Sequence, residues 1–145
     1  MACVIGRNCE VGPFAHLRGT VLEDGAEIGN FVEAKKTRLG AGAKAKHLTY
    51  LGDADGRCAC QHQRRTITAN YDGKPKHATR IGERCFVGSG TVIVAPSQLG
   101  DHSMTGAGAI VKRGSVSALG EVRGRRAGEE AARTDRRRRV AGQGD

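Results

Sequence analysis

An aliphatic residue recurs at every sixth position along most of the chain, and a glycine or another small residue often follows it. From residue 81 to residue 111 the pattern has no break, and it is equally regular between residues 5 and 17. The positions in this pattern are Ile5, Val11, Leu17, Ile28, Leu39, Leu51, Ile81, Val87, Ile93, Leu99, Thr105 and Val111. A period of six is too short for helical repeats and is typical of the hexapeptide form of the parallel β-helix.

Each six-residue unit is predicted to be a short strand followed by a turn, with the aliphatic side chain pointing inward and the small residue allowing the chain to bend. Three units would make a triangular coil of 18 residues, and successive coils would stack roughly 4.8 Å apart. About six or seven such coils fit into residues 1–120. The strict spacing of the aliphatic residues argues against a disordered, glycine-rich segment.

Composition agrees with a fold built from small residues. Aromatic residues make up only 3% of the 145 residues, while 22 residues are glycine. The formal net charge is +9, and residues 1–120 hold 16 basic and 10 acidic groups, which favours anionic partners such as phosphorylated small molecules. The chain shows no signal peptide and no long apolar run, so we predict a cytoplasmic, reducing setting and no membrane partner.

Several segments interrupt the repeat and carry polar residues that the inward-pointing positions of the β-helix do not require. These segments read "GPFAHLR" (12–18), "IGNFVEAKK" (28–36), "KHLTYLGDA" (46–54), "NYDG" (70–73) and "IGERCFVGSGTVIVAP" (81–96). In this order and spacing they resemble the acetyltransferase domain of the bifunctional GlmU family, over about residues 3–123. The resemblance implies an all-β, single-stranded left-handed parallel β-helix that forms a homotrimer, with active sites between subunits.

The resemblance also implies a reaction, the transfer of an acetyl group from acetyl-CoA to the amine of glucosamine-1-phosphate during UDP-N-acetylglucosamine biosynthesis. A sugar ammonium must lose a proton before it can attack a thioester, and imidazole is a suitable general base at neutral pH. By resemblance, His47 in "KHLTY" is that base. No metal is needed for this transfer.

The remaining predicted site residues also follow from the resemblance, and the cationic ones suit a phosphorylated sugar because Arg and Lys bind phosphate. The predicted substrate-binding residues are Arg18, Lys35, Tyr50, Gln61 and Lys76. The predicted acetyl-CoA-binding residues are Arg64, Asn70, Tyr71, Ser89, Ala107 and Arg123.

The stretch "GRCACQHQRR" (56–65) departs from the family pattern, which has an inward Ile and small residues here. Gln61 replaces a sugar-binding Asn, and Arg64 replaces a small residue that contacts acetyl-CoA. His62 takes the inward aliphatic place, and Arg65 takes the place of a turn glycine. Burying an unpaired polar side chain costs roughly 2–7 kcal/mol, so the segment predicts a weakened β-helix. A catalytically impaired fragment that keeps the fold is therefore the alternative function.

Two explanations of this stretch compete. For one choice of codons, reading Cys60–Arg65 in a frame shifted by one base gives Ala-Asn-Ile-Ser-Ala-Gly, which restores the family residues; sequencing the gene would test this hypothesis. Alternatively, Cys58, Cys60 and His62 stand at alternate positions of a predicted strand and would point to one side, where they could bind Zn²⁺. A closed structural zinc site needs four ligands, which disfavours the second explanation.

The ends of the chain lie outside the predicted repeat. The β-helix domain is predicted over residues 1–123 as an N-terminally truncated form of the family, without a nucleotidyltransferase domain. Residues 124–145 are predicted to be a basic, flexible and possibly helical tail. It has no aromatic residues to stack on bases, which disfavours RNA binding. A metal-dependent β-helix enzyme with three converging histidines is a further alternative, and the context of "KHLTYLGDA" argues against it.

Overall fold

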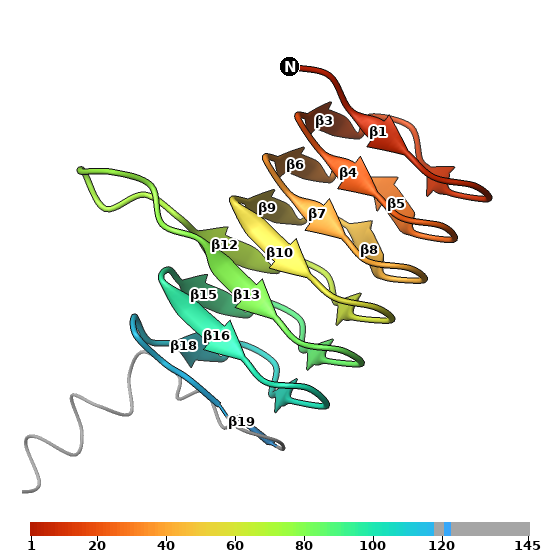
Figure 1. The fold of residues 1–145 in the computed structure, drawn as a ribbon. Coiled ribbons are helices and arrows are strands. Elements are labelled where there is room, and N and C mark those ends of the chain that lie inside the picture. Colours follow the sequence, from red (N-terminus) through yellow and green to blue (C-terminus); the bar gives the residue numbers. More distant parts are fainter. Residues whose placement is uncertain (118–120, 123–145) are drawn as a thin grey trace, which may run out of the picture.

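The computed structural model of the chain describes residues 1–117 and 121–122, and these residues form short parallel strands that wind around one axis (Figure 1). Each turn of the chain contributes one strand to each of three sheets, so neighbouring strands in a sheet come from successive coils. The architecture is a solenoid of about six turns, of the left-handed β-helix type found in hexapeptide-repeat proteins. The predicted all-β fold is confirmed.

The three sheets are named A, B and C here. Sheet A contains β1 (Val4–Ile5), β4 (Val21–Leu22), β7 (Arg38–Leu39), β10 (Ala54–Gly56), β13 (Thr79–Ile81) and β16 (Ser97–Leu99). Sheet B contains β2 (Glu10–Val11), β5 (Glu27–Asn30), β8 (Lys44–His47), β11 (Gln61–His62), β14 (Phe86–Val87), β17 (Met104–Thr105) and β19 (Glu121–Val122). Sheet C contains β3 (His16–Arg18), β6 (Glu33–Lys35), β9 (Tyr50–Gly52), β12 (Ile67–Ala69), β15 (Val92–Val94) and β18 (Ile110–Val111).

The register corrects the predicted coil length. In the first coils each residue pairs with the one 17 positions later, as Val4 does with Val21, whereas Arg80 pairs with Gln98, 18 positions later. In the shorter coils, the connection at the corner between sheets C and A has one residue fewer. Gly19, Lys36 and Asp53 have positive φ at this corner and turn the chain tightly. The prediction of 18 residues per coil therefore holds only for the later coils.

One coil is longer because of a loop. Asp55 pairs with Arg80, 25 positions later, and the additional residues form the loop between β12 and β13 that projects from the solenoid in Figure 1. The side chain of Asp72 anchors this loop, because Arg113 donates a hydrogen bond to it over 2.8 Å and the His77 ring lies 3.1 Å from it. The loop is therefore attached to a later coil.

The core consists of inward side chains stacked in ladders along the axis. The fully buried aliphatic residues are Leu22, Ile28, Leu39, Leu51, Ile81, Val87, Ile93, Leu99 and Val111. Buried threonines bond to backbone groups; Thr37, for example, donates a hydrogen bond of 2.8 Å to the Leu51 carbonyl. Small aliphatic and hydroxyl side chains are enough to fill the narrow interior.

Close stacking of coils leaves no room for a side chain at some glycines. A Cβ added at Gly29 would overlap the carbonyl oxygen of Lys46 in the next coil, whereas a Cβ at Gly106 would meet no atom of the described residues within 4 Å. Gly29→Ala is therefore expected to lower the free energy of unfolding by about 2–3 kcal/mol through overpacking. Gly106→Ala, the matched control directly after β17, is expected to change it by less than about 0.5 kcal/mol. Urea unfolding of both variants measures the difference, and equal effects would contradict this packing.

The irregular stretch 56–65 continues the solenoid with residues poorly suited to it. His62 lies in the inward ladder of sheet B between Ala45 and Val87, and it is 3% exposed. No residue in the described part of the chain forms a hydrogen bond with either of its ring nitrogens. The small residues Ala45 and Gly56 leave space for the ring, since a Cβ at Gly56 would lie 3.7 Å from His62 Nε2. The prediction that His62 takes an inward place is confirmed.

Arg65 occupies the predicted turn position. Its φ is 61°, and the corresponding residues in the later coils are Gly90 and Gly108, which also have positive φ. Such a backbone conformation favours glycine, but Phe14, Phe31 and Leu48 adopt it at the same corner in the earlier coils, so Arg65 follows their pattern. Residues 56–65 thus complete one coil while placing an unsatisfied imidazole inside it.

Candidate active site

Three cations converge where sheet C meets the projecting loop. Arg18 and Lys35 stand on neighbouring strands in direct register, and both lie on the outer surface. Lys76 from the loop approaches Lys35 closely; this contact is the main reason that the pKa of Lys35 lies below its usual value, and Arg18 adds to it. Because like charges gather here, the cluster is suited to an anion.

Glu33 restrains one of these cations. The Arg18 guanidinium forms an ion pair with Glu33, and both side chains are partly exposed. The Nε atom of Arg18 is nevertheless buried, and no described residue accepts a hydrogen bond from it. The rest of this guanidinium is partly exposed, so it can bind an anion beside Lys35. Sequence reasoning identified Glu33 only as a polar residue, because its partner lies on the preceding coil.

Tyr50 and Asn70 meet over Gly52. A Cβ at Gly52 would lie 2.6 Å from the Tyr50 hydroxyl and 2.5 Å from Nδ2 of Asn70, so the glycine makes room for both groups. Asn70 is buried, and its amide donates a hydrogen bond of 2.5 Å to Asp53. The structure therefore places Asn70, a predicted acetyl-CoA ligand, beside the predicted sugar ligand Tyr50. Asp53, which orients it, was not singled out from the sequence.

His47 begins a column of residues along the corner between sheets B and C. Backbone hydrogen bonds join successive coils here: Arg65 N to His47 O at 3.4 Å, Gly90 N to Arg64 O at 2.8 Å, and Gly108 N to Ser89 O at 2.7 Å. The column therefore runs through four predicted site residues, all exposed: His47, Arg64, Ser89 and Ala107. An imidazole and a line of small residues thus share one edge of the solenoid.

The other predicted site residues lie elsewhere on the protomer. Gln61 is on sheet B between Lys44 and Phe86 and is exposed. Tyr71 is in the projecting loop and 64% exposed. Arg123 and the predicted tail at 124–145 lie outside the described residues. The protomer therefore presents the predicted residues on sheet C, the B–C corner, sheet B and the loop.

The predicted zinc arrangement is wrong. Cys58 is exposed, whereas Cys60 and His62 are buried, because a turn separates Cys58 from β11 and breaks the alternation of a strand. Among the described residues, no group of three or more His, Cys, Asp or Glu side chains could hold a metal ion. All five cysteines are free thiols.

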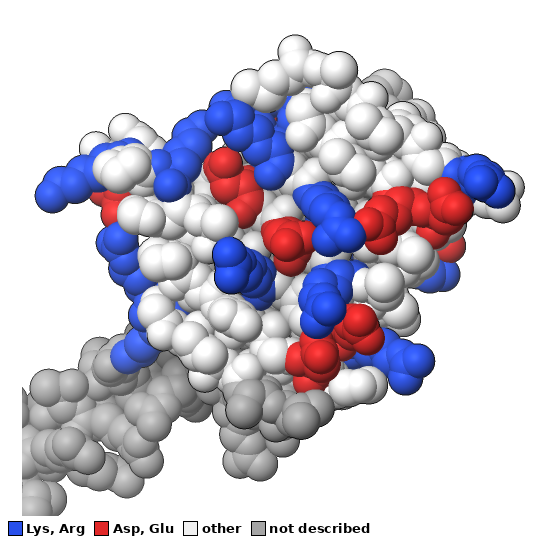
Figure 2. Space-filling view, in the orientation of Figure 1, with Lys and Arg blue, Asp and Glu red and all other residues white. Residues whose placement is uncertain are grey.

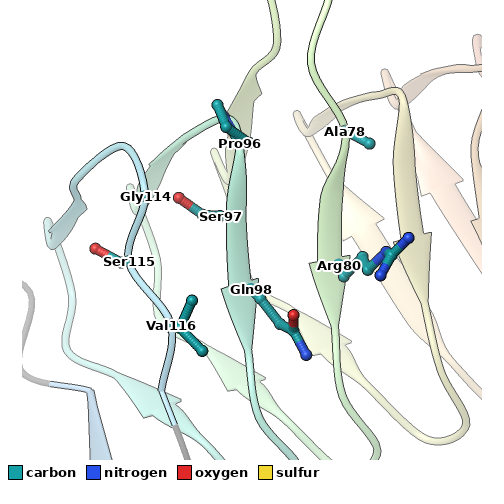
Figure 3. Close-up of a pocket in the computed structure, with 8 residues that line it drawn as sticks. All are labelled: Ala78, Arg80, Pro96, Ser97, Gln98, Gly114, Ser115 and Val116. Atoms are coloured by element: carbon teal, nitrogen blue, oxygen red, sulfur yellow. The ribbon is translucent and has the colours of Figure 1, made fainter.

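A separate groove lies on sheet A. Its walls come from β13, β16 and the segment after β18 (Figure 3), and the lining residues are Ala78, Arg80, Pro96, Ser97, Gln98, Gly114, Ser115 and Val116. None of them is a predicted site residue. Acidic and basic side chains alternate over the face shown in Figure 2 and form ion pairs, such as those of Arg38 with Glu23 and Asp55. The acidic and basic side chains on sheet A therefore largely neutralise one another.

Comparisons with known proteins agree with this geometry. Residues 78–113 match the family model described as bacterial transferase hexapeptide (six repeats). The chain is 54% identical to the bifunctional protein GlmU of Nitratidesulfovibrio vulgaris (strain DP4) over 123 residues, which cover 83% of this chain and 27% of that protein. It is 58% identical to GlmU of Sphingopyxis alaskensis over 108 residues, 74% of this chain and 24% of that protein. The chain thus spans about a quarter of the length of these relatives.

Solved structures show the same fold. A mutant of perosamine N-acetyltransferase from Caulobacter crescentus, in complex with CoA and GDP-perosamine, matches 77% of this chain and 51% of its own, with a TM-score of 0.62 and 21% identity. A hexapeptide transferase family protein from Anaplasma phagocytophilum matches 94% of this chain and 92% of its own, with a TM-score of 0.57 and 15% identity.

The family assignment rests on the repeat, the fold and the identity with GlmU sequences taken together. The described residues contain no helix long and apolar enough to cross a lipid bilayer. The chain is a hexapeptide-repeat domain of the left-handed β-helix type, and its sequence matches the C-terminal region of GlmU.

Proposed function

We propose that this chain transfers an acetyl group from acetyl-CoA to the amine of glucosamine-1-phosphate, the step that gives N-acetylglucosamine-1-phosphate in UDP-N-acetylglucosamine and cell-wall synthesis. The observation that carries the proposal is the arrangement along the corner between sheets B and C. His47 is exposed at a corner in line with Ser89 and Ala107, and Tyr50 follows it three residues later on sheet C. More than half of the aligned residues are identical to those of a GlmU protein.

The residues divide between the two substrates. Arg18, Lys35 and Lys76 hold the sugar phosphate, since the partly exposed guanidinium and the crowded ammonium groups both gain from a dianion. Tyr50 binds a sugar hydroxyl, and Asn70 is held beside it by Asp53. Ser89 and Ala107 leave an unobstructed edge along which the arm of acetyl-CoA lies. The predicted binding set is completed by Gln61, Arg64, Tyr71 and Arg123.

His47 acts as the general base in this proposal. It removes a proton from the sugar amine while the nitrogen attacks the thioester carbonyl carbon, and a C–N bond forms. The C–S bond then breaks, and the leaving thiolate takes up the proton as CoA thiol. The imidazole is regenerated in each turnover, so the step needs neither a metal ion nor an external acid.

We also propose that the active form is a cytoplasmic homotrimer. The predicted ligands of one protomer face in different directions: Tyr50 lies on sheet C, Gln61 on sheet B and Tyr71 on the loop. A neighbouring subunit packed against the B–C corner would bring such faces together. Symmetric association supplies this arrangement with one repeated interface. Sedimentation equilibrium tests the proposal, and a purely monomeric active enzyme would overturn it.

The test of the activity is a thiol-release assay with acetyl-CoA and glucosamine-1-phosphate, with the product identified by mass spectrometry. Release of CoA that depends on both substrates supports the proposal. A folded chain that binds neither substrate and releases no thiol would overturn it. Glucosamine without the phosphate is the control acceptor, since it lacks the group that the three cations bind.

Removing one of these cations gives a sharper test. Lys76→Ala is expected to raise KM for glucosamine-1-phosphate about tenfold while kcat changes little, because the lost contact is with the phosphate in both ground and transition states. Lys74→Ala removes the same charge from another exposed position of the same loop and is expected to change KM less than twofold. Steady-state kinetics compare the two variants. Equal effects on KM would mean that Lys76 acts only through the overall positive charge of the loop and does not contact the phosphate.

A second candidate, a catalytically impaired fragment of the enzyme, is favoured by one observation. His62 is buried without partners, and Arg64 stands where the resemblance places a small residue. Replacing Cys60–Arg65 by Ala-Asn-Ile-Ser-Ala-Gly is expected to raise both the melting temperature and kcat/KM for acetyl transfer, the latter at least tenfold. The thiol-release assay compares both chains, and an unchanged kcat/KM would reject impairment by this segment.

A further inference from the structure

The loop between β12 and β13 carries Lys76, one of the three cations of the proposed sugar-phosphate site. It projects from the solenoid where the chain passes from sheet C to sheet A (Figure 1), and residues 71–76 are all exposed. Within residues 1–117, no hydrogen bond between backbone groups joins residues 71–76 to the coils. Side chains therefore decide where this part of the loop lies.

The place that Lys76 takes is electrostatically unfavourable by itself. Lys76 approaches Lys35 so closely that the pKa of Lys35 falls below its usual value, and Arg18 adds a third like charge. Coulomb repulsion among these groups acts to move the loop away from sheet C until an anion binds. A site that is ready for phosphate therefore requires another contact that holds the loop.

Asp72 forms such a contact with a later coil. Its carboxylate accepts hydrogen bonds of 2.8 Å from Arg113 and 3.1 Å from the Lys74 amide, and a ring nitrogen of His77 lies 3.1 Å away. The Lys74 N–H, Arg113 and His77 hold the pKa of Asp72 below its usual value. The carboxylate is therefore ionised at neutral pH, and the Asp72–Arg113 ion pair ties the loop to the solenoid.

Arg113 acts on the loop from a position well separated from the cations. Sheet C has the strand order β18, β15, β12, β9, β6 and β3, and the loop begins after β12. Arg113 follows β18, whereas Lys35 is on β6, so their strands lie four spacings apart, about 19 Å at the usual strand separation. The guanidinium of Arg113 therefore binds Asp72 and is not one of the cations around a phosphate beside Lys35.

From these observations we infer that Asp72 and Arg113 are positioning residues for the sugar-phosphate site, because their ion pair keeps Lys76 beside Lys35 against the repulsion of like charges. The inference rests on the proposed function and deepens it. A loop that is already held in place binds its ligand more tightly, since less of the interaction energy is used to order it. Neither positioning residue contacts the substrate.

Asp72→Asn tests the inference sharply, because two possible effects have opposite signs. Removing a negative charge makes the protein more positive, so the overall field alone would tighten the binding of glucosamine-1-phosphate. Loss of the ion pair is instead expected to raise both Kd, measured by calorimetry, and KM by about threefold to fivefold, with kcat nearly unchanged. Glu10→Gln removes a negative charge from an exposed position on sheet B and is expected to raise neither value.

A double-mutant cycle shows whether the ion pair acts through Lys76. Arg113→Gln alone is expected to raise Kd and KM for glucosamine-1-phosphate by about threefold to fivefold, as Asp72→Asn does. In a chain that already carries Lys76→Ala, the same change is expected to add less than about 1.5-fold, because the cation that it positions is gone. Arg113→Lys keeps the charge and is expected to keep both values within about twofold of the unaltered chain.

The outcomes separate this inference from the proposed function. Unchanged or tighter binding in Asp72→Asn overturns the inference, even where acetyl transfer is observed, and so does a full effect of Arg113→Gln in the absence of Lys76. Weaker binding in Asp72→Asn together with the coupling to Lys76 upholds it. If glucosamine-1-phosphate binds in this way and no thiol is released from acetyl-CoA, the proposed catalytic function alone fails. An unaltered chain that does not bind glucosamine-1-phosphate would overturn both.

Discussion

Replacing His62 with isoleucine is expected to raise the free energy of unfolding by about 2–3 kcal/mol at pH 7. The imidazole is buried between Ala45 and Val87, and neither ring nitrogen finds a partner. Isoleucine has a similar volume and no polar atoms, so it removes the desolvation cost while it fills the same space. Urea unfolding followed by circular dichroism measures the change. A loss of stability in His62→Ile would show that the imidazole is satisfied in solution.

The same residue makes stability depend on pH. Burial lowers the pKa of His62 from 6.5 to about 4, because the charged imidazolium is disfavoured inside the β-helix. The folded state therefore binds the proton less readily than the unfolded state. Above pH 6.5 the titration of His62 does not change the free energy of unfolding. Between pH 6.5 and about 4 the free energy of unfolding falls, because the unfolded state binds the proton first, and below pH 4 it is constant. The total loss of free energy of unfolding is about 3 kcal/mol.

Unfolding measured between pH 7.5 and pH 4 tests this dependence. His62→Ile is expected to show a much flatter profile, since it lacks the titrating group. His16→Gln replaces an exposed histidine on sheet C and is expected to keep the profile of the unaltered chain. Parallel profiles for all three proteins would mean that other groups, such as the paired carboxylates, cause the acid sensitivity.

The second large effect is expected at His47. His47→Ala should lower kcat for acetyl transfer by about 10²–10⁴-fold, the range that general acid–base catalysis supplies. Since His47 is exposed, the melting temperature should change little. Thiol release is measured at saturating substrate concentrations, and the binding of both substrates is measured separately. The control is again His16, because His16→Ala removes an exposed imidazole from the neighbouring sheet.

Binding and turnover measured together distinguish a base from a positioning residue. In His47→Ala, kcat is expected to fall while Kd for both substrates changes little, because proton transfer acts in the transition state and not in binding. A loss of activity below tenfold would assign the proton transfer to another group.

Much of the fold could be predicted because its determinants are local. An aliphatic residue every sixth position specifies a strand and a turn, and identical units can stack in only one regular way. The departure at 56–65 could also be predicted from the sequence: His62 interrupts the inward aliphatic positions, Arg65 stands at the turn, and both lie where the repeat places them. The residues of each motif were also visible in the sequence, through their resemblance to GlmU.

The sequence by itself thus determined whether each side chain points into the β-helix or away from it. What only the tertiary structure decided is which residues of different coils meet. The coil length sets the register: a coil of 17 residues aligns His47 with Arg64, and the coil that carries the loop, with 25 residues, aligns Arg64 with Ser89. The pairing of Asp72 with Arg113 spans 41 positions, so the local spacing of residues along the sequence does not predict it. Such contacts depend on how the coils stack in space, because a one-residue change in coil length shifts every neighbour along the corner.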